Sequence, residues 1–272
     1  MLTIAGNARG PKPGRITTDE AAALNRQTWD SIRRQRDEGL IAKHHDIAAE
    51  LRAGKGSLYP EQRALLGDVA GKRMLDLGCG DGMELLQWTQ AGASVVGVDN
   101  SPRQLAAARR AADALGLVCQ LVLADLLRLP EDLRRGEFDI VFSSWVTAWI
   151  GDLDLWFSTA YRALRRGGAL LLTGAHPLSS FFGEQRRGHT RRQSYFEQGP
   201  FIDHSDGRSP EWNPAGDRRT SVEWSPTLGA LVTSVAHTGL RITHLVEAGD
   251  ATEKTGLAAG YPGRFTLRAV KD

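Results

Sequence analysis

The chain has 272 residues, of which 41% are hydrophobic, and a formal net charge of +2 at pH 7. Such a chain can bury one sizeable hydrophobic core and still carry an appended subdomain. The small net charge and the lack of a long apolar run or a signal-peptide pattern argue against a nucleic-acid or membrane partner.

The N-terminal part of the chain is predicted to form a mobile arm followed by a helical cap. Residues 1–16 contain Gly, Pro and basic residues without periodicity, which is typical of a mobile segment. The pattern Thr17-Thr-Asp-Glu20 is a capping box, and it opens a helix that runs to about Arg36. A second amphipathic helix is expected over Leu40–Leu51, and the cap as a whole covers residues 17–70.

From Gly71 onward, short apolar runs alternate with helical segments at the spacing of βαβ units. Five of these runs are almost continuously apolar, as parallel strands buried on both faces should be: 74–77, 94–98, 118–123, 137–143 and 169–173. The final segment, 225–272, adds a helix and two last strands, 240–246 and 265–270. The sequence therefore predicts an α/β fold: a Rossmann-like, doubly wound, mostly parallel seven-stranded sheet with its core in residues 71–176.

The alternation stops between residues 177 and 224, which are rich in Arg, Gly, Pro, Ser and aromatic residues. A long segment of this kind within a compact domain is usually functional, so we predict a substrate lid inserted between strands five and six. It carries a basic cluster that is either a solvated face or a site for an acidic substrate: Arg186, Arg187, His189, Arg191 and Arg192.

Three glycines at alternate positions follow the first predicted strand, in the stretch Met74-Leu-Asp-Leu-Gly-Cys-Gly-Asp-Gly82. In an open α/β sheet this turn lies at the carboxyl edge, where ligands bind. Glycines let the backbone approach a ligand closely, and the N–H groups of the following helix favour negative or electron-rich atoms. A dinucleotide-binding turn would need a small residue where Met83 stands.

The spacing Asp-x-Gly-x-Gly-x-Gly instead resembles motif I of the class I S-adenosylmethionine-dependent methyltransferases. Val95-Val-Gly-Val-Asp99-Asn-Ser resembles their second motif, and the long segment after strand five is similar to that of the methyltransferase-11-like group, which acts on small molecules. The resemblance implies S-adenosylmethionine as cofactor. Asp99 would then accept hydrogen bonds from both ribose hydroxyls, since a carboxylate offers two oxygens to a vicinal diol.

The same resemblance implies roles for the other residues near the predicted carboxyl edge. Asp76 would help to fix the methionine ammonium, Gly78 and Gly80 would leave room for the methionine part, and Asp125 would accept from the adenine amino group. The complete set of implied cofactor-binding residues is Asp76, Gly78, Cys79, Gly80, Asp99, Asn100, Gln104, Asp125, Leu126 and Ser143.

Aromatic residues gather on the segments that should face the acceptor. We expect Trp29, Trp145, Phe181 and Tyr195 to contact it, as members of a larger set with Trp149, Phe182, Phe196, Phe201 and Trp212. His176 directly follows strand five and is the first candidate for a general base. The alternatives are His44, His45, His189, His204, Tyr195 and Glu197. A base is needed only if the acceptor carries a proton of high pKa.

The sequence thus predicts methyl transfer to O, N or C of a small molecule by in-line displacement in a lidded pocket, in specialised metabolism. We expect a cytoplasmic monomer or homodimer with reduced Cys79 and Cys119, without a metal or nucleic acid. Two alternatives stay open. A nicotinamide-dependent oxidoreductase is disfavoured by Met83 and by the lack of a Tyr-x-x-x-Lys pair. The other alternative is a protein that binds S-adenosylmethionine without transferring its methyl group, and no sequence feature argues against it.

Overall fold

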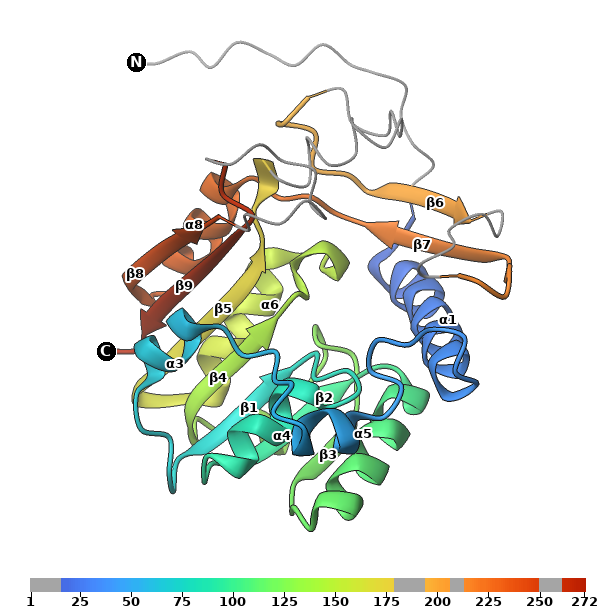
Figure 1. Ribbon diagram of the computed structural model, residues 1–272. Coiled ribbons are helices and arrows are strands. Elements are labelled where there is room, and N and C mark those ends of the chain that lie inside the picture. Colours follow the sequence, from blue (N-terminus) through green and yellow to red (C-terminus); the bar gives the residue numbers. More distant parts are fainter. Residues whose placement is uncertain (1–15, 179–193, 206–212, 250–260) are drawn as a thin grey trace.

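The computed structural model of the protein describes residues 16–178, 194–205, 213–249 and 261–272 (Figure 1). Residues 1–15 of the expected arm lie outside this part of the chain. So do Phe181, Phe182, Trp212 and the whole basic cluster with His189.

The core is a single seven-stranded sheet in the order β3-β2-β1-β4-β5-β9-β8. The first five strands are parallel, and β9 pairs antiparallel with both β5 and β8. Their bounds are β1 (Arg73–Leu77), β2 (Ser94–Asp99), β3 (Gln120–Leu123), β4 (Phe138–Ser144), β5 (Leu164–Ala175), β8 (Arg241–Ala248) and β9 (Arg264–Val270). This confirms the predicted Rossmann-like, mostly parallel seven-stranded sheet. The chain order reverses between β1 and β4, which makes their carboxyl ends the expected place for a ligand.

Helices cover both faces of the sheet (Figure 1). One face packs against α2 (Ile47–Arg52), α3 (Pro60–Leu66), α4 (Met83–Gln90) and α5 (Pro102–Leu115). There Trp88 of α4 meets Phe142 of β4 edge to face at 5.7 Å. The other face packs against α6 (Leu153–Ala163), α8 (Leu228–His237) and the short 3-10 helix η1 (Glu131–Arg134), with Trp156 and Phe157 of α6 buried against it.

Several element boundaries differ from the sequence prediction, three of them by two residues or more at the start of the element. The second helix begins at Ile47, because Asp46 caps it through the N–H of Ala49 and His44 has a φ of 57°, which no helix residue adopts. Strand β3 begins only at Gln120. Strand β5 begins at Leu164, directly after helix α6, and not at residue 169.

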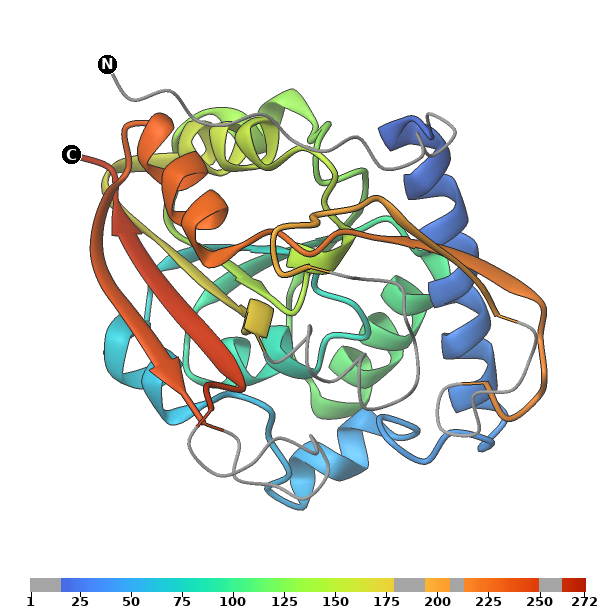
Figure 2. The ribbon, with the colours of Figure 1, turned by 90° about the horizontal axis from the view of Figure 1, so that it is seen from above.

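The first helix, α1 (Thr18–Asp37), starts at the predicted capping box and packs against a hairpin formed by β6 (Phe201–Ser205) and β7 (Arg219–Glu223). The side-chain amide of Asn25 donates to the carbonyl oxygen of Val222 and accepts from its N–H, both at 2.8 Å. We call α1 and this hairpin together the cover. Seen from above in Figure 2, the hairpin crosses the carboxyl edge of the sheet toward α1. None of the helices in the described part of the chain combines the length and apolar character needed to span a bilayer.

Candidate functional site

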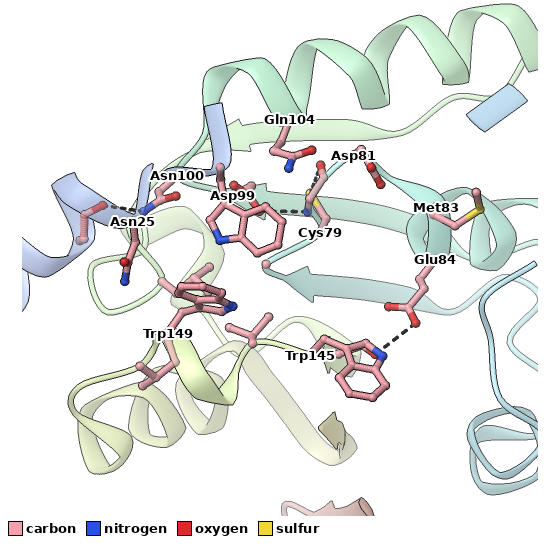
Figure 3. A pocket seen from close by; sticks show the side chains of 18 of the residues that line it. Asn25, Cys79, Asp81, Met83, Glu84, Asp99, Asn100, Gln104, Trp145 and Trp149 are labelled. Atoms are coloured by element: carbon pink, nitrogen blue, oxygen red, sulfur yellow. Dashed lines mark hydrogen bonds between the residues drawn. The ribbon is translucent and has the colours of Figure 1, made fainter. Parts of the chain in front are cut away.

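A cavity of about 580 Å³ lies between the cover and the carboxyl ends of β1, β2 and β4 (Figure 3). Its lining comes from α1, the glycine turn, the tip of β2, the segments after β3 and β4, and the hairpin end at Trp224. The site therefore assembles segments from both ends of the chain around the point where the strand order reverses.

The glycine turn after β1 is fixed to β2 and is open toward the cavity. The N–H groups of Gly78 and Cys79 both donate to the carbonyl oxygen of Val98, at 2.8 and 3.0 Å. A Cβ atom at Gly78 would lie 2.4 Å from Cγ2 of Val146, whereas one at Gly80 would meet no atom within 4 Å. The absence of a side chain at Gly78 thus lets Val146 pack closely against the turn. At Gly80 it leaves open space in the cavity.

Asp99 at the tip of β2 lines the cavity and is held by two backbone groups. Its Oδ2 accepts from the N–H of Gly80 at 2.9 Å, and its Oδ1 accepts from the N–H of Ser101 at 2.9 Å. Burial raises the pKa of this carboxyl to about 6. Because each carboxylate oxygen can accept a second hydrogen bond, the side chain is able to take both hydroxyls of a vicinal diol.

Four further residues of the predicted cofactor site line the same cavity: Asn100, Gln104, Asp125 and Leu126. Gln104 is only 2% exposed, and no described group donates to its Oε1. A buried acceptor of this kind needs a donor, which a bound ligand can provide. Asn100 donates from Nδ2 to the carbonyl oxygen of Ala22 at 3.3 Å and so connects the tip of β2 to α1.

Asp76 and Ser143 lie behind the cavity and are not among the residues that line it. Asp76 is 2% exposed, and its Oδ2 has no hydrogen-bond partner in the described part of the protein. Burial, together with the nearby carboxyls of Glu84 and Asp99, raises the pKa of Asp76 well above its usual value. The Oγ of Ser143 donates to the carbonyl oxygen of Leu77 at 2.6 Å, which ties β4 to β1.

Glu84 is a lining residue that the sequence interpretation did not single out. It lies in the first turn of α4, and Oγ of Ser144 donates to its Oε1 at 3.1 Å. Burial raises the pKa of Glu84 to about 7. The sequence does contain a feature that could have identified Glu84: it is an acidic residue two positions after the third glycine, at the start of a helix that faces the expected ligand.

A buried ionic cluster around Asp81, also missed in the sequence, joins the glycine turn to the N-terminal segment. Nη1 of Arg36 donates to Oδ2 of Asp81 at 2.7 Å, and Arg33 and His44 approach the same oxygen at 3.4 and 3.2 Å. Burial alone would raise the pKa of Asp81, but the hydrogen bond from His44 and the charges around it lower the value. Asp81 therefore stays ionised, and its Oδ2 is bound by the N-terminal segment.

Several aromatic rings line the cavity. Trp29 of α1 meets Trp149 of the 3-10 helix η2 (Thr147–Trp149) edge to face at 5.4 Å, and Tyr59 lies 6.2 Å from Trp145. Trp145 has a φ of 60°, which is rare for a bulky residue and typical of functional sites. The expectation that Trp29 and Trp145 line the acceptor region fits this geometry, and Trp149, Tyr59 and Trp224 extend the aromatic surface.

Two other predicted residues lie elsewhere. His176 is 2% exposed and is not among the lining residues; its Nε2 lies 2.7 Å from Oε1 of Glu247, and its Nδ1 accepts from the N–H of Leu178. Catalysis by His176 would therefore require its hydrogen bond with Glu247 to open. The hydroxyl of Tyr195 accepts from the N–H of Leu228 at the start of α8. Of the alternative bases within the described residues, only His44 lines the cavity.

Comparisons with known proteins agree with this geometry. Residues 75–172 match the family model described as a methyltransferase domain. A stretch of 136 residues is 37% identical to demethylmenaquinone methyltransferase of Thermus thermophilus, covering 48% of this chain and 61% of that protein. Another of 136 residues is 32% identical to malonyl-[acyl-carrier protein] O-methyltransferase of Serratia marcescens, covering 50% and 47%. The chain thus spans about half the length of the curated relatives it matches.

Among solved structures, the S-adenosylmethionine-dependent methyltransferase from Mesorhizobium loti superimposes with a TM-score of 0.60 at 26% sequence identity. The match covers 78% of this chain and 96% of that one. The similarity therefore extends beyond residues 75–172.

Proposed function

We propose that the protein transfers a methyl group from S-adenosylmethionine to a small-molecule acceptor, because residues 75–172 match the methyltransferase-domain family model and the fold resembles that of an S-adenosylmethionine-dependent methyltransferase. The observation that carries this proposal is one cavity lined both by Asp99 with the glycine turn and by the aromatic residues Trp29, Tyr59, Trp145, Trp149 and Trp224. The family, enzyme class and cofactor expected from the sequence all agree with the comparisons.

The residues at the glycine turn fit this cofactor. The carboxylate oxygens of Asp99 can accept hydrogen bonds from the ribose hydroxyls. Oε1 of Gln104, which has no partner among the described residues, can accept a hydrogen bond from another N–H or O–H group of the nucleoside. The same nucleoside would be enclosed by Asn100, Asp125 and Leu126. The methionine part of the cofactor would lie along Gly78, Cys79 and Gly80. Asp76 and Ser143 would support the turn from behind. When bound, S-adenosylmethionine supplies a methyl group on a positively charged sulfur.

The residues of this chain supply position and exclusion of water. The Trp29–Trp149 and Tyr59–Trp145 pairs form a surface that suits a planar, apolar acceptor, and they keep water away from it. A fixed acceptor lowers the barrier of an in-line displacement, because less orientational freedom is lost on the way to the transition state. The acceptor atom is O, N or C of a small planar compound of specialised metabolism, and the β6–β7 hairpin, which belongs to the predicted lid segment 177–224, acts as a lid.

Calorimetry with S-adenosylhomocysteine, S-adenosylmethionine and NAD tests the cofactor assignment. We expect both sulfur nucleosides to bind and NAD not to bind. Binding of NAD alone would support the oxidoreductase alternative and overturn the proposal.

Mass spectrometry then tests transfer, with a panel of phenols, amines and quinols incubated with the protein and S-adenosylmethionine. We expect an acceptor to gain the mass of one CH2 group. Nucleoside binding with no such gain across the panel would instead support the non-methylating alternative.

A further inference from the structure

The turn that joins β2 to α5 carries three residues that line the cavity: Asp99, Asn100 and Gln104. Figure 3 shows them together on one side of the cavity. Ser101 lies within the same turn, is completely buried and is not among the lining residues. The shape of this turn therefore determines where the carboxylate of Asp99 and Oε1 of Gln104 point.

Ser101 is connected by hydrogen bonds to both of these acceptor residues. Its N–H donates to Oδ1 of Asp99 at 2.9 Å, and its Oγ accepts from the N–H of Gln104 at 3.1 Å, as the N-cap of α5. A serine hydroxyl that accepts a hydrogen bond still has a proton to donate. Ser101 donates it to Oδ1 of Asp30 at 2.6 Å. One buried side chain thus links the cavity wall to the first helix of the chain.

Asp30 belongs to α1 and contacts the start of α5 from outside that helix. Its Oδ1 also accepts from the N–H of Arg103 at 3.3 Å. The first N–H groups of a helix have no partner within it, and a negative charge beside them is stabilising. Asp30 is half-buried and is not among the residues that line the cavity, so any effect that it has on a ligand there is transmitted by the turn.

A second contact places α1 along the turn. Nδ2 of Asn100 donates to the carbonyl oxygen of Ala22 at 3.3 Å. Asp30 follows Ala22 by eight positions in α1, which corresponds to about 12 Å along the helix axis. The turn is therefore held against α1 at two separate points, and its position depends on the N-terminal helix as well as on β2.

We infer that Asp30 is a positioning residue for the nucleoside ligand: by holding Ser101, it fixes the carboxylate of Asp99 that accepts from the ribose. The inference rests on the proposed function, because it assumes that the nucleoside is bound at Asp99. Each oxygen of that carboxylate accepts from one backbone N–H, of Gly80 or of Ser101, so the group is oriented before a ligand arrives. A site that is fixed in advance loses less freedom on binding, and its affinity is higher.

Calorimetry with S-adenosylhomocysteine tests this role. Asp30→Ala removes the acceptor of Ser101 and should weaken binding by about tenfold. Asp30→Asn keeps an oxygen that can accept from Ser101 and from the N–H of Arg103, so its affinity should stay within about threefold of the wild type. Arg110→Gln is the matched control, because it breaks another contact between α5 and α1, the exposed ion pair with Asp37. It should change the affinity by less than about twofold.

A double-mutant cycle separates positioning from a general loss of stability. If Asp30 acts through the carboxylate of Asp99, Asp30→Ala should change the affinity by less than about twofold when Asp99→Ala is already present. An equal loss with and without Asp99 overturns the inference. So does an unchanged affinity in Asp30→Ala, or a loss in Asp30→Asn as large as that in Asp30→Ala. A wild-type protein that does not bind S-adenosylhomocysteine contradicts the proposed function instead.

Hydrogen exchange of the wild-type protein gives a readout that needs no variant. If the contact with α1 strengthens nucleoside binding, the bound nucleoside must strengthen that contact by the same factor. We expect S-adenosylhomocysteine to slow the exchange of backbone amides in α1, and we expect the slowing to be smaller in Asp30→Ala. Exchange in α1 that is the same with and without the nucleoside would overturn the inference.

Discussion

The carboxylate of Asp81 accepts a hydrogen bond from Nη1 of Arg36 at 2.7 Å, and both side chains are almost completely buried. Arg33 shares the same oxygen and also donates to the carbonyl oxygen of His44. This contact joins α1 to the second half of the glycine turn, so the position of the cover depends on an acidic residue within the cofactor motif.

Removing that acid should destabilise the protein strongly. Asp81→Asn removes the carboxylate that the buried guanidinium groups of Arg33 and Arg36 share, and we expect the free energy of unfolding to fall by about 3 kcal/mol. Urea denaturation followed by circular dichroism measures this change. Arg110→Gln, which removes an exposed ion pair with Asp37, should cost less than about 1 kcal/mol. Equal effects of the two substitutions would show that the buried cluster contributes no more than a surface pair.

Asp99 is expected to dominate nucleoside recognition from the tip of β2. Asp99→Ala leaves the ribose hydroxyls without acceptors and should weaken binding of S-adenosylhomocysteine by about 1–3 kcal/mol in calorimetry. Asp154→Ala changes an exposed acid of α6 and serves as the control. If the affinity of the Asp99 variant equals that of the wild type, Asp99 does not belong to the site.

Alanine substitutions at Gly78 and Gly80 should distinguish a glycine needed for packing within the protein from one needed for the ligand to enter the cavity. Both residues have positive φ, 84° at Gly78 and 53° at Gly80, so each substitution carries a backbone cost of about 1–2 kcal/mol. Gly78→Ala adds a clash with Val146 and should lower the melting temperature further than Gly80→Ala does. The Gly80 variant should fold and lose nucleoside affinity, because its methyl group enters the cavity. A Gly80 variant that is the less stable of the two would contradict this assignment.

Stability of the ligand-free protein should decrease as pH rises from 5 to 8. The pKa values of Glu84 and Asp99 are raised in the folded state, to about 7 and about 6. The folded protein thus binds more protons than the unfolded chain in this range, and the free energy of unfolding falls with pH. Thermal denaturation across the range measures the slope. The slope should be smaller in Glu84→Gln, and a stability that increases toward pH 8 would refute the raised pKa values.

The part of the site that follows directly from parallel strands was predictable from the sequence. Asp99 and Asp125 each end a strand, and strand ends of a parallel sheet meet at one edge, so both line the cavity. Trp29 was also placed there, although it lies far from the glycine turn in sequence. The existence of the five parallel strands β1 to β5 followed from the apolar runs, although β3 and β5 begin at other residues than predicted.

The remaining residues depend on docking between distant segments, which no local pattern encodes. Arginines on an amphipathic helix usually face solvent. Arg33 and Arg36 are nevertheless buried, because the carboxylate of Asp81 pairs with both. Leu40 was placed on the apolar side of a helix and is 50% exposed, because that helix does not extend so far. In the sequence, Glu84 has the position of an ordinary acidic residue in the first turn of a helix. The structure adds the hydroxyl of Ser144, which donates to Glu84, and the charge of Lys43, which acts on it.

The backbone of Val222 has its hydrogen-bonding partner in the side chain of Asn25, almost two hundred positions earlier. A shortened chain beginning at Gly71 would keep every strand of the large sheet and the whole of residues 75–172. It would nevertheless remove the side-chain partner of that N–H and carbonyl and expose the nucleoside region to solvent on the side where Trp29 now lies. Trimming the protein to its most recognisable portion would therefore yield a fragment that keeps the sheet but has lost one side of its binding chamber.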